Sequence, residues 1–349
     1  MRVLLDARMV SANIHGISRY LINLARGLHR RGHEISILSA HHTAAEIIGL
    51  DVIENVAPCL LPFAHPLETL ELARVTRRVP YDVVHFPSFS IPFVLPPRSV
   101  VTIHDLIHLY PPVRLSHKIY YQTLVKQSLK SCRSVISVSE WTKKDLFEKL
   151  QIPENQIHVV RNGLEEKWFQ KFEAGKSPMT VPFFLCLSNP KPHKNVKTLL
   201  SACQKLWEQN HNFNLALSLG GGEFQKDLRF PSGYEHRIRV LKNLADHELL
   251  AYFTHARAVV SPSLYEGFDY PAAEGLALGR QVIISGGSAH DELKGEKLRI
   301  YGDAEDSEKL AAELLKCFLA PDDFGGPAPN NVPTLDEMVE GTLKVYEKA

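Results

Sequence analysis

The sequence is poor in features that would assign it to a disulfide-rich, zinc-binding or membrane-spanning class. Its 349 residues include five scattered cysteines, none paired as C-x-x-C, which argues against both a disulfide framework and a zinc site. No apolar run approaches the length that spans a bilayer. The chain starts directly with the apolar strand Val3–Leu5 rather than with a basic start and an apolar signal core. We therefore expect a reduced, cytoplasmic protein.

An excess of one charge is also missing, because 40 Lys and Arg residues balance 39 Asp and Glu residues, for a formal net charge of +1. This near-zero net charge does not indicate a nucleic-acid ligand or a strongly acidic partner. The charge is unevenly distributed, however, since residues 1–170 carry a net charge of +5 and the remainder carries −4. A positive amino-terminal half suits an anionic membrane surface or an anionic acceptor.

The sequence does contain two successive series of buried strands that alternate with helix signals. Amphipathic helices such as 18–30 follow the strands of the first series, a Pro- and Gly-containing linker covers 171–182, and a second series opens at Phe183. This order predicts an α/β fold of two doubly wound, Rossmann-like domains that face each other across a ligand cleft. The expected strands are 3–5, 34–38, 83–86, 100–103 and 134–138, then 183–187, 214–219, 258–260 and 281–284.

The most informative stretch is Ser261–Gly279, which follows an expected strand. Pro271 suits the first position of a helix, and Gly279 suits the left-handed residue that ends one. Glu266 should then lie in the loop at the strand's carboxyl end, and Glu274 in the first helical turn. Ligands of open α/β sheets bind at that edge, and a helix N-terminus favours phosphate. Two carboxylates at such a place suit a ligand with phosphates and many hydroxyls, such as a nucleotide sugar.

This segment, "SPSLYEGFDYPAAEGLALG" followed by "QVIISGGSAHDEL", resembles the E-x7-E signature of retaining GT-B glycosyltransferases of family 4. A lone glutamate in a first helical turn could serve only to stabilise the helix, but the whole segment is much more specific. The resemblance implies that Glu274 binds the ribose hydroxyls and that Glu266 binds a hydroxyl of the transferred sugar. It also implies donor contacts by Gly267 and Phe268, through their N–H groups, and by Asp269.

The loop "NPKPHKN" after the strand 183–187 resembles the family's G-R/T-x-x-P-x-K-N loop, in which Lys194 stands at the phosphate-binding lysine. A single lysine is usually a solvated surface residue. A cation at the carboxyl edge of this sheet can, however, neutralise the charge that a leaving diphosphate gains. Further along, Gly220–Glu223 resembles the family's glycine turn under the nucleotide.

The chain departs from the family pattern at three of these positions. Tyr270 replaces a small residue or leucine, and Gly275 replaces the usual alanine after the second glutamate. Asn189, which we count among the donor contacts, stands where many members carry arginine. Either Lys194 therefore neutralises the diphosphate largely alone, or Lys191 or His193 assists it.

Two motifs in the amino-terminal half complete the resemblance. "GISRY" opens a helix and resembles the family's GIGRY loop, with Ser18 in place of the second glycine. Gly16 permits close backbone approach to a phosphate or sugar, although a glycine before a helix is commonly just a turn residue. "VTIHDL" ends a strand and resembles the histidine motif, which implies that His104 lies beside the transferred sugar. The alternatives are a locally satisfied histidine and, for Asp105, a loop-ordering or acceptor-side role.

The segment 108–133 mixes Tyr, Leu and Val with Lys and Arg at helical spacing. A basic amphipathic helix can lie on an anionic bilayer. The ordinary alternative is a surface helix with one face packed inward. We therefore carry peripheral association with the inner face of the cell membrane as a hypothesis for this half.

The motifs follow the family's order, and the resemblance implies three parts. Residues 1–170 form an acceptor-binding domain, residues 171–330 form a nucleotide-sugar-binding domain, and residues 331–349 form a helix that crosses back to the first. The expected enzyme is a retaining, metal-independent hexosyltransferase with His104, Lys194 and Glu266 as catalytic residues. It would move a mannose- or glucose-type sugar from a UDP or GDP donor, its only co-substrate, to a glycan or lipid-linked hydroxyl in polysaccharide or lipopolysaccharide biosynthesis.

Several rival functions compete with that of a transferase. A non-catalytic subunit that binds a sugar nucleotide or a partner enzyme is favoured only by the replacement at Asn189. An epimerase would need more carboxylates, and a phosphorylase would need a basic phosphate site or a pyridoxal lysine. A NAD-binding protein is disfavoured because G-x-G-x-x-G does not follow the first strand. No convincing Asp-x-Asp motif or histidine cluster supplies a metal site.

Overall fold

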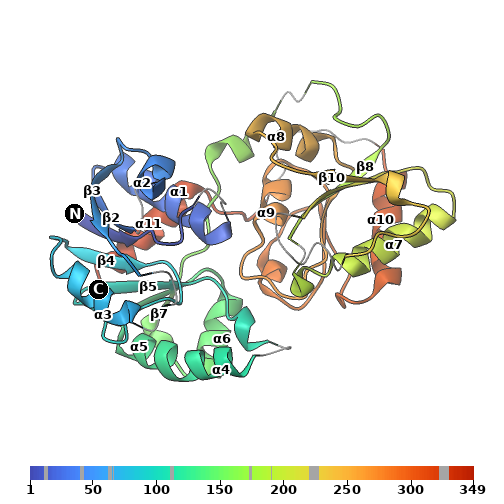
Figure 1. Cartoon of the computed structure of the whole chain (residues 1–349). Helices are drawn as coiled ribbons and strands as arrows, with labels where there is room; N and C mark the ends of the chain where they lie inside the picture. Colours follow the sequence, from blue (N-terminus) through green and yellow to red (C-terminus); the bar gives the residue numbers. More distant parts are fainter. Residues whose placement is uncertain are drawn as a thin grey trace. The chain divides into compact units, whose positions relative to one another are not determined.

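The computed structural model describes the chain except for residues 12–14, 40–42, 62–64, 66, 111–113, 173–174, 190, 220–227 and 322–329. Two compact units make up the described residues (Figure 1). Unit 1 comprises residues 1–165 and 333–349, and unit 2 comprises residues 166–332. The final helix, α11 (Leu335–Tyr346), therefore belongs to unit 1 although the whole of unit 2 precedes it in sequence.

Unit 1 is built on a parallel sheet of seven strands in the order β3-β2-β1-β4-β5-β6-β7. Its central strands are short runs of buried apolar residues, as expected for a sheet covered on both faces. The strands are β1 (Arg2–Asp6), β2 (Glu34–Ser39), β3 (Ile53–Pro58), β4 (Val83–Phe86), β5 (Ser99–Ile103), β6 (Ser134–Ser137) and β7 (Ile157–Val159).

Helices cover both faces of this sheet, because alternate strand residues point to opposite sides. Val3 and Leu5 pack in the core under α1, α2 and α11, whereas Leu4 packs in the core under α3, α5 and α6. Gly27 of α1 lies against Val339 of α11 so closely that a Cβ would come within 2.5 Å of it. The helices are α1 (Gly16–Arg30), α2 (Thr43–Ile48), α3 (Glu68–Thr76), η1 (Ile107–Leu109), α4 (Leu115–Tyr120), the π-turn η2 (Tyr121–Val125), α5 (Lys126–Ser131), α6 (Glu140–Leu150), η3 (Glu154–Gln156) and α11.

Unit 2 repeats the architecture with a parallel sheet of six strands in the order β10-β9-β8-β11-β12-β13. The strands are β8 (Phe183–Leu187), β9 (Asn214–Ser218), β10 (Ile238–Leu241), β11 (Val259–Ser261), β12 (Val282–Ile284) and β13 (Leu298–Ile300). The helices are η4 (Glu166–Phe169), η5 (Pro192–Lys194), α7 (Val196–Glu208), η7 (Glu235–Arg237), α8 (Asp246–His255), α9 (Tyr270–Ala277), η8 (Ala289–Glu292) and α10 (Ser307–Leu319).

Strand order in both sheets reverses direction at one point. In unit 1 this switch lies between β1 and β4, and in unit 2 it lies between β8 and β11. Loops at the carboxyl ends of such neighbours diverge and leave room for a ligand. The two loops that carry Lys194 and Glu266 therefore flank the switch point of unit 2.

The buried strands expected from the sequence are all present within a residue or two of their predicted ends. All five cysteines are buried and form no disulfide. Among the described residues, no helix combines the length and the apolar character needed to cross a bilayer.

Candidate functional site

The loops at the switch point of unit 2 bring two predicted site residues into direct contact. Lys194 donates from Nζ to Oε1 of Glu266 at 2.5 Å, and the hydroxyl of Ser263 donates to the same oxygen at 2.7 Å. The side chains of Lys194 and Glu266 remain 22% and 11% exposed. A cation and a carboxylate that are paired yet reachable are placed to exchange some of their mutual contacts for contacts with a ligand.

The position of Lys194 is fixed by its neighbour, Asn195. Asn195 adopts a left-handed conformation with φ of 52° and ends the short turn η5. Its amide nitrogen donates to the carbonyls of Pro262 at 2.9 Å and Ala304 at 2.6 Å, which ties three loops together. The sequence motif ended on Asn195, but its role in joining the loops was not anticipated, since both partners are distant in sequence.

Helix α9 begins beside the Glu266 loop and carries the second glutamate. Pro271 stands in its first turn and Gly279 has a φ of 69° after its end, as the sequence indicated. The helix starts at Tyr270, however, with Asp269 as its N-cap, so Glu274 is its fifth residue. Glu274 therefore lies just beyond the first turn, which corrects the predicted placement, and its side chain is buried.

The replacement of alanine by Gly275 has a packing explanation. A Cβ at this position would come within 2.9 Å of Cγ2 of both Val259 and Val282. Glycine thus lets α9 lie directly on strands β11 and β12. The close packing holds the Glu274 backbone against the sheet.

Asp269 was predicted to contact the donor, and the structure gives its carboxylate internal partners. Oδ1 accepts from the backbone N–H of Ala272 at 3.2 Å, which caps α9, and Oδ2 lies 3.1 Å from Nδ1 of His290. Burial alone would raise the pKa of the Asp269 carboxyl, but the hydrogen bond and charge of His290, with a contribution from Lys194, keep that pKa below its usual value. His290 was not singled out in the sequence.

The other described residues predicted in unit 2 lie in the loops that follow β8 and β11. Gly267 and Phe268 lie buried in the loop between Glu266 and α9, and the Phe268 ring meets Tyr270 edge-on at 5.2 Å. Asn189 accepts from the backbone N–H of Lys191 at 3.2 Å and so shapes its own loop. The glycine turn predicted at 220–223 lies outside the described residues.

In unit 1 the predicted residue His104 follows strand β5. Its ring packs edge-on against Tyr20 at 4.8 Å, while its Nε2 is buried and has no hydrogen-bond partner among the described residues. Burial lowers the pKa of His104 to about 4, against the opposing effect of its hydrogen bond to the Pro87 backbone. A carbonyl can only accept, so the bonded nitrogen carries the proton and Nε2 is left as an acceptor.

The first turn of α1 lies near this histidine, since the charge of His15 acts on His104. Gly16 opens α1, and no described atom lies within 4 Å of the position its Cβ would take. Glycine is therefore not required there by packing. Ser18 donates to the Met9 carbonyl at 2.8 Å, and Asp105 accepts from the Ile107 N–H at 3.0 Å, which is the loop-ordering role.

The switch point of unit 1 holds an ion cluster that sequence reasoning missed. Arg8 binds Asp6 at 2.7 Å and Glu68 at 2.9 Å, and the Ser90 hydroxyl donates to Glu68 at 2.7 Å. The Arg8 side chain is 2% exposed, and both carboxylates are 5% exposed. Glu68 and Ser90 lie 60 and 82 residues from Arg8 in sequence, and the four residues form no motif, so only the fold reveals the cluster. In the part of the chain that the structure describes, no cluster of His, Cys, Asp and Glu could hold a metal ion.

Comparison with known proteins gives two adjoining family matches. Residues 14–168 match the model described as Glycosyltransferase Family 4, and residues 167–322 match that of Glycosyl transferases group 1. The O-antigen chain mannosyltransferase RfbU of Salmonella typhimurium is 27% identical over 62% of this chain and 61% of its own length. O-antigen chain mannosyltransferase B of Escherichia coli is 24% identical over 90% of both chains.

Solved structures share the fold over nearly the whole chain. A glycosyltransferase from Rickettsia africae ESF-5 superposes with a TM-score of 0.73 at 19% identity and covers 99% of this chain and 98% of its own. HepE of Anabaena, solved in complex with UDP-glucose, gives a TM-score of 0.69 at 17% identity and covers 99% and 94%.

Proposed function

This chain belongs to glycosyltransferase family 4 and has the GT-B fold, and from that premise we propose that it transfers a hexose from a nucleotide-diphosphate sugar to a hydroxyl of a glycan or lipid-linked acceptor. The O-antigen mannosyltransferases among its relatives favour mannose as the sugar and polysaccharide or lipopolysaccharide assembly as the setting. The observation that carries the proposal is the Lys194–Glu266 pair at the switch point of unit 2.

Unit 2 binds the donor in this proposal. The charge of Lys194 acts on Asp269, the N-cap of α9, so cation and helix dipole act together on the leaving diphosphate. The N–H groups of Gly267 and Phe268 add donors in the same loop. Glu266 accepts from a sugar hydroxyl, while Glu274 accepts from the ribose.

We also propose that His104 of unit 1 accepts a hydrogen bond from a sugar hydroxyl. A buried nitrogen without a partner is costly unless a ligand satisfies it. Because Nε2 of His104 is such an atom among the described residues, a sugar hydroxyl is a fitting partner for it. The low pKa keeps the ring neutral and Nε2 unprotonated at physiological pH.

We further propose that the reaction retains the anomeric configuration and needs no metal ion. The acceptor attacks on the face from which the diphosphate leaves, and the departing phosphate takes the acceptor's proton. Lys194 and the α9 dipole then stabilise the charge that a metal ion would otherwise neutralise. The checks are the anomeric coupling constant of the product and activity after exhaustive chelation.

The test of function is sugar transfer from labelled GDP-mannose, GDP-glucose, UDP-glucose and UDP-galactose to lipid-linked glycan acceptors. We expect one donor to be used, and Glu274→Gln to lose most of that activity. Glu208→Gln, at the exposed C-terminal end of α7, should keep it. Donor binding without transfer to any acceptor would instead favour the non-catalytic subunit that the replacement at Asn189 suggests.

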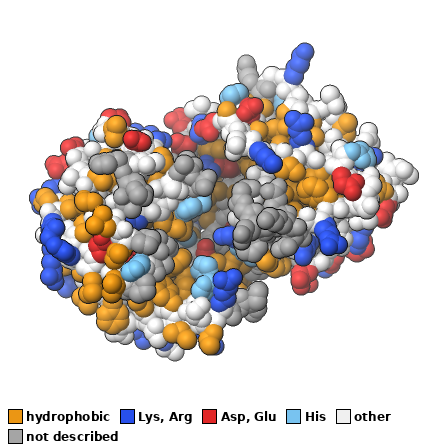
Figure 2. Space-filling view, viewed as in Figure 1, with side chains coloured by type: hydrophobic (Ala, Val, Ile, Leu, Met, Phe, Trp, Pro, Cys, Tyr) orange, Lys and Arg blue, Asp and Glu red, His pale blue; other side chains and the backbone are white. Residues whose placement is uncertain are grey.

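Association with an anionic membrane is a separate part of the proposal, supported by one surface of unit 1. Residues 93–133 contain six basic residues and one acidic residue. Apolar side chains are exposed in the same segment, including Val94 at 69%, Leu115 at 71% and Ile119 at 54%. Figure 2 shows apolar side chains gathered on the visible face of unit 1, with basic ones at the margins.

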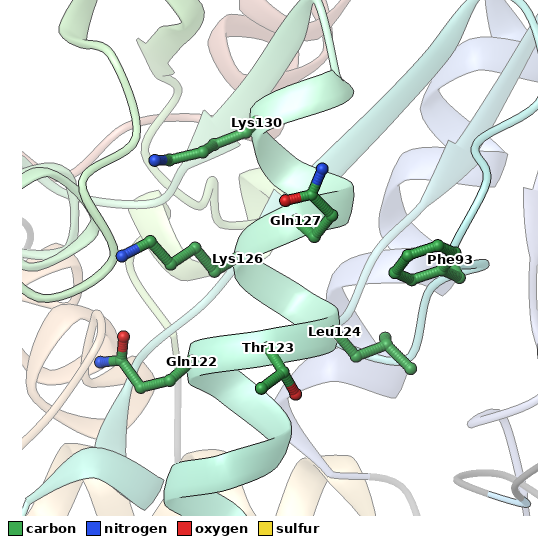
Figure 3. A pocket seen from close by; sticks show the side chains of 7 residues that line it. All are labelled: Phe93, Gln122, Thr123, Leu124, Lys126, Gln127 and Lys130. Atoms are coloured by element: carbon green, nitrogen blue, oxygen red, sulfur yellow. The ribbon is translucent and has the colours of Figure 1, made fainter.

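The helical part of this surface has the two-sided character of an interfacial helix. A shallow hollow of about 510 Å³ lies over η2 and α5. Figure 3 shows Lys126 and Lys130 extending from one side of the helix, while Leu124 and Phe93 lie on the other. Each lysine near an anionic bilayer contributes about 1 kcal/mol, and the exposed apolar groups can enter the headgroup region.

Vesicle sedimentation tests this surface. The protein should bind vesicles that contain phosphatidylglycerol and should not bind purely zwitterionic ones. Lys126→Glu with Lys130→Glu should abolish binding, while Lys144→Glu on α6, an exposed lysine outside the segment, should not. Equal vesicle binding by all variants would rule this surface out as the membrane contact. It would not contradict the proposed donor site.

A further inference from the structure

Asp269 stands in a backbone conformation that most side chains avoid. Its φ of 76° and ψ of 72° lie in the left-handed region, which glycine adopts freely and other L-residues adopt rarely. Aspartate is among the few other residues that adopt it, because its short side chain can form local hydrogen bonds there. The Asp269 carboxylate has two partners, the first turn of α9 through Ala272 and the imidazole of His290.

Both ring nitrogens of His290 lie within hydrogen-bonding distance of a polar partner. The Ser285 hydroxyl lies 2.5 Å from the carbonyl of Ser263, so its single hydrogen points to that carbonyl. Its oxygen also lies 3.2 Å from Nε2 of His290. Nδ1 of the same ring donates to the carboxylate of Asp269. The ring of His290 is thus held at both nitrogens, and the side chains of His290 and Asp269 are 0% and 1% exposed.

The pair is connected to both ends of the loop that carries Glu266. At one end, Ser285 holds the Ser263 backbone, and the Ser263 hydroxyl donates to Glu266 at 2.7 Å. In the middle, the N–H of Ala289, beside His290, lies 3.4 Å from the Glu266 carbonyl. At the other end, Asp269 is bound directly. The loop after β12 thus braces the loop after β11 at three points.

We propose that the Asp269–His290 ion pair is a positioning device that holds Glu266 and the N-terminus of α9 in the geometry that binds the donor diphosphate. This inference rests on the proposed donor site. Stability alone would not require an ion pair here, because well-packed apolar residues commonly replace a buried pair without loss. What apolar residues cannot reproduce is the directed set of hydrogen bonds that joins α9, the Glu266 loop and the loop after β12.

The test separates folding from positioning by a double-mutant cycle. His290→Leu leaves a buried carboxylate unpaired and should lower both stability and nucleotide affinity. The double variant Asp269→Gly, His290→Leu removes both charges and suits the left-handed backbone, so its stability should return toward wild type. Its affinity for GDP or UDP, whichever the wild type binds, should nevertheless stay roughly 10- to 100-fold weaker, because a small misplacement of binding groups has effects of that size.

Two further variants sharpen the result. Asp269→Asn keeps the helix cap and an acceptor for His290, so it should retain most of the affinity. Leu314→Ala opens a cavity in the fully buried core of α10 and should lower stability without changing nucleotide affinity. Calorimetric titration with GDP and UDP, beside urea unfolding, gives both quantities.

The outcomes are distinct. Wild-type nucleotide affinity in the stabilised double variant would overturn the positioning role but would not contradict the proposed donor site. Failure of the wild type to bind any nucleoside diphosphate would overturn the proposed function and this inference with it. Weak nucleotide binding in a stable double variant, together with unchanged affinity in Leu314→Ala, would establish the role.

Discussion

The two units share a sheet topology but fill their switch points differently. In unit 1 the position is occupied by the protein's own ion cluster, in which Arg8 is only 2% exposed between two carboxylates. In unit 2 it is occupied by Lys194 and Glu266, which remain 22% and 11% exposed. A common fold thus provides the same edge twice. We expect the side chains placed there to decide whether that edge is closed or can accept an anionic ligand.

The largest effect on stability is expected from a substitution in the buried ion cluster of unit 1. Arg8→Met leaves Asp6 and Glu68 buried without a cation and should destabilise unit 1 by about 3–5 kcal/mol. Arg2→Met is the matched control, because the Arg2–Asp82 pair is 47% and 33% exposed and is screened by water, so its loss should cost far less. Urea unfolding followed through Trp141, which lies in unit 1, measures both.

Nucleotide binding by unit 2 should survive Arg8→Met at temperatures where unit 1 remains folded. A cost below about 1 kcal/mol for Arg8→Met would show that the cluster is not the tightly buried network described. Loss of nucleotide binding in a folded variant would show that Arg8 belongs to the donor site.

Lys194→Ala should have the next largest effect, and on catalysis rather than on folding. Removal of the cation that faces the leaving diphosphate should lower kcat by roughly 10²–10³-fold, as loss of one preorganised electrostatic group commonly does. The donor KM should change less, since the charge develops in the transition state. Lys194→Arg keeps the charge and should recover part of the rate, whereas full activity in Lys194→Ala would refute the diphosphate assignment.

The units should also differ in their response to acid. Burial lowers the pKa of His85 to about 3 and that of His104 to about 4, and both residues lie in unit 1. The unfolded chain takes up these protons nearer pH 6.5, so stability falls as pH drops from about 6.5 toward 4, by on the order of 2 kcal/mol per histidine at pH 5.

Hydrogen exchange of peptides from each unit at pH 7 and pH 5, corrected for intrinsic rates, measures this difference. Unit 1 should lose more protection than unit 2. His85→Gln keeps hydrogen bonding to Tyr346 and Thr102 without the titration and should reduce the loss. Equal loss of protection in both units would contradict the assignment of the acid sensitivity to His85 and His104.

The smallest effect is expected at Asn189. Asn189→Arg restores the residue that many family members carry and should leave donor affinity unchanged or raise it a few-fold, since an added cation faces a diphosphate. Asn189→Ala is the control for the loop contact to Lys191. Donor titration measures all three proteins, and a large loss in Asn189→Arg would reveal a specific role for the amide.

Much of the fold follows from the sequence because central strands of parallel sheets are continuous apolar runs. The strands β3, β7, β10 and β13 were missed, and all four lie at the edges of the sheets. Their residues are largely half-buried or exposed, so they lack the apolar signal. In β3 the sequence even ends on Pro58, which an edge strand tolerates.

The candidate site was predictable where its residues are neighbours in sequence. Glu266, Glu274 and Lys194 fall in short motifs with recognisable spacing. No local sequence pattern predicts the roles of His290, Asn195 and Arg8. Their partners lie from 2 to 109 residues away in sequence. The start of α9 shifted by one residue because Asp269 caps the helix through its side chain.

The most direct measurement is calorimetric titration of the wild type and Glu274→Ala with UDP, GDP, ADP, TDP and CDP in the presence of chelator. We predict that one nucleotide binds to the wild type and that Glu274→Ala, with its fold intact, does not bind it. Absence of binding to every nucleotide, or equal binding by Glu274→Ala, would contradict the claim that the switch point of unit 2 is a nucleotide-sugar site.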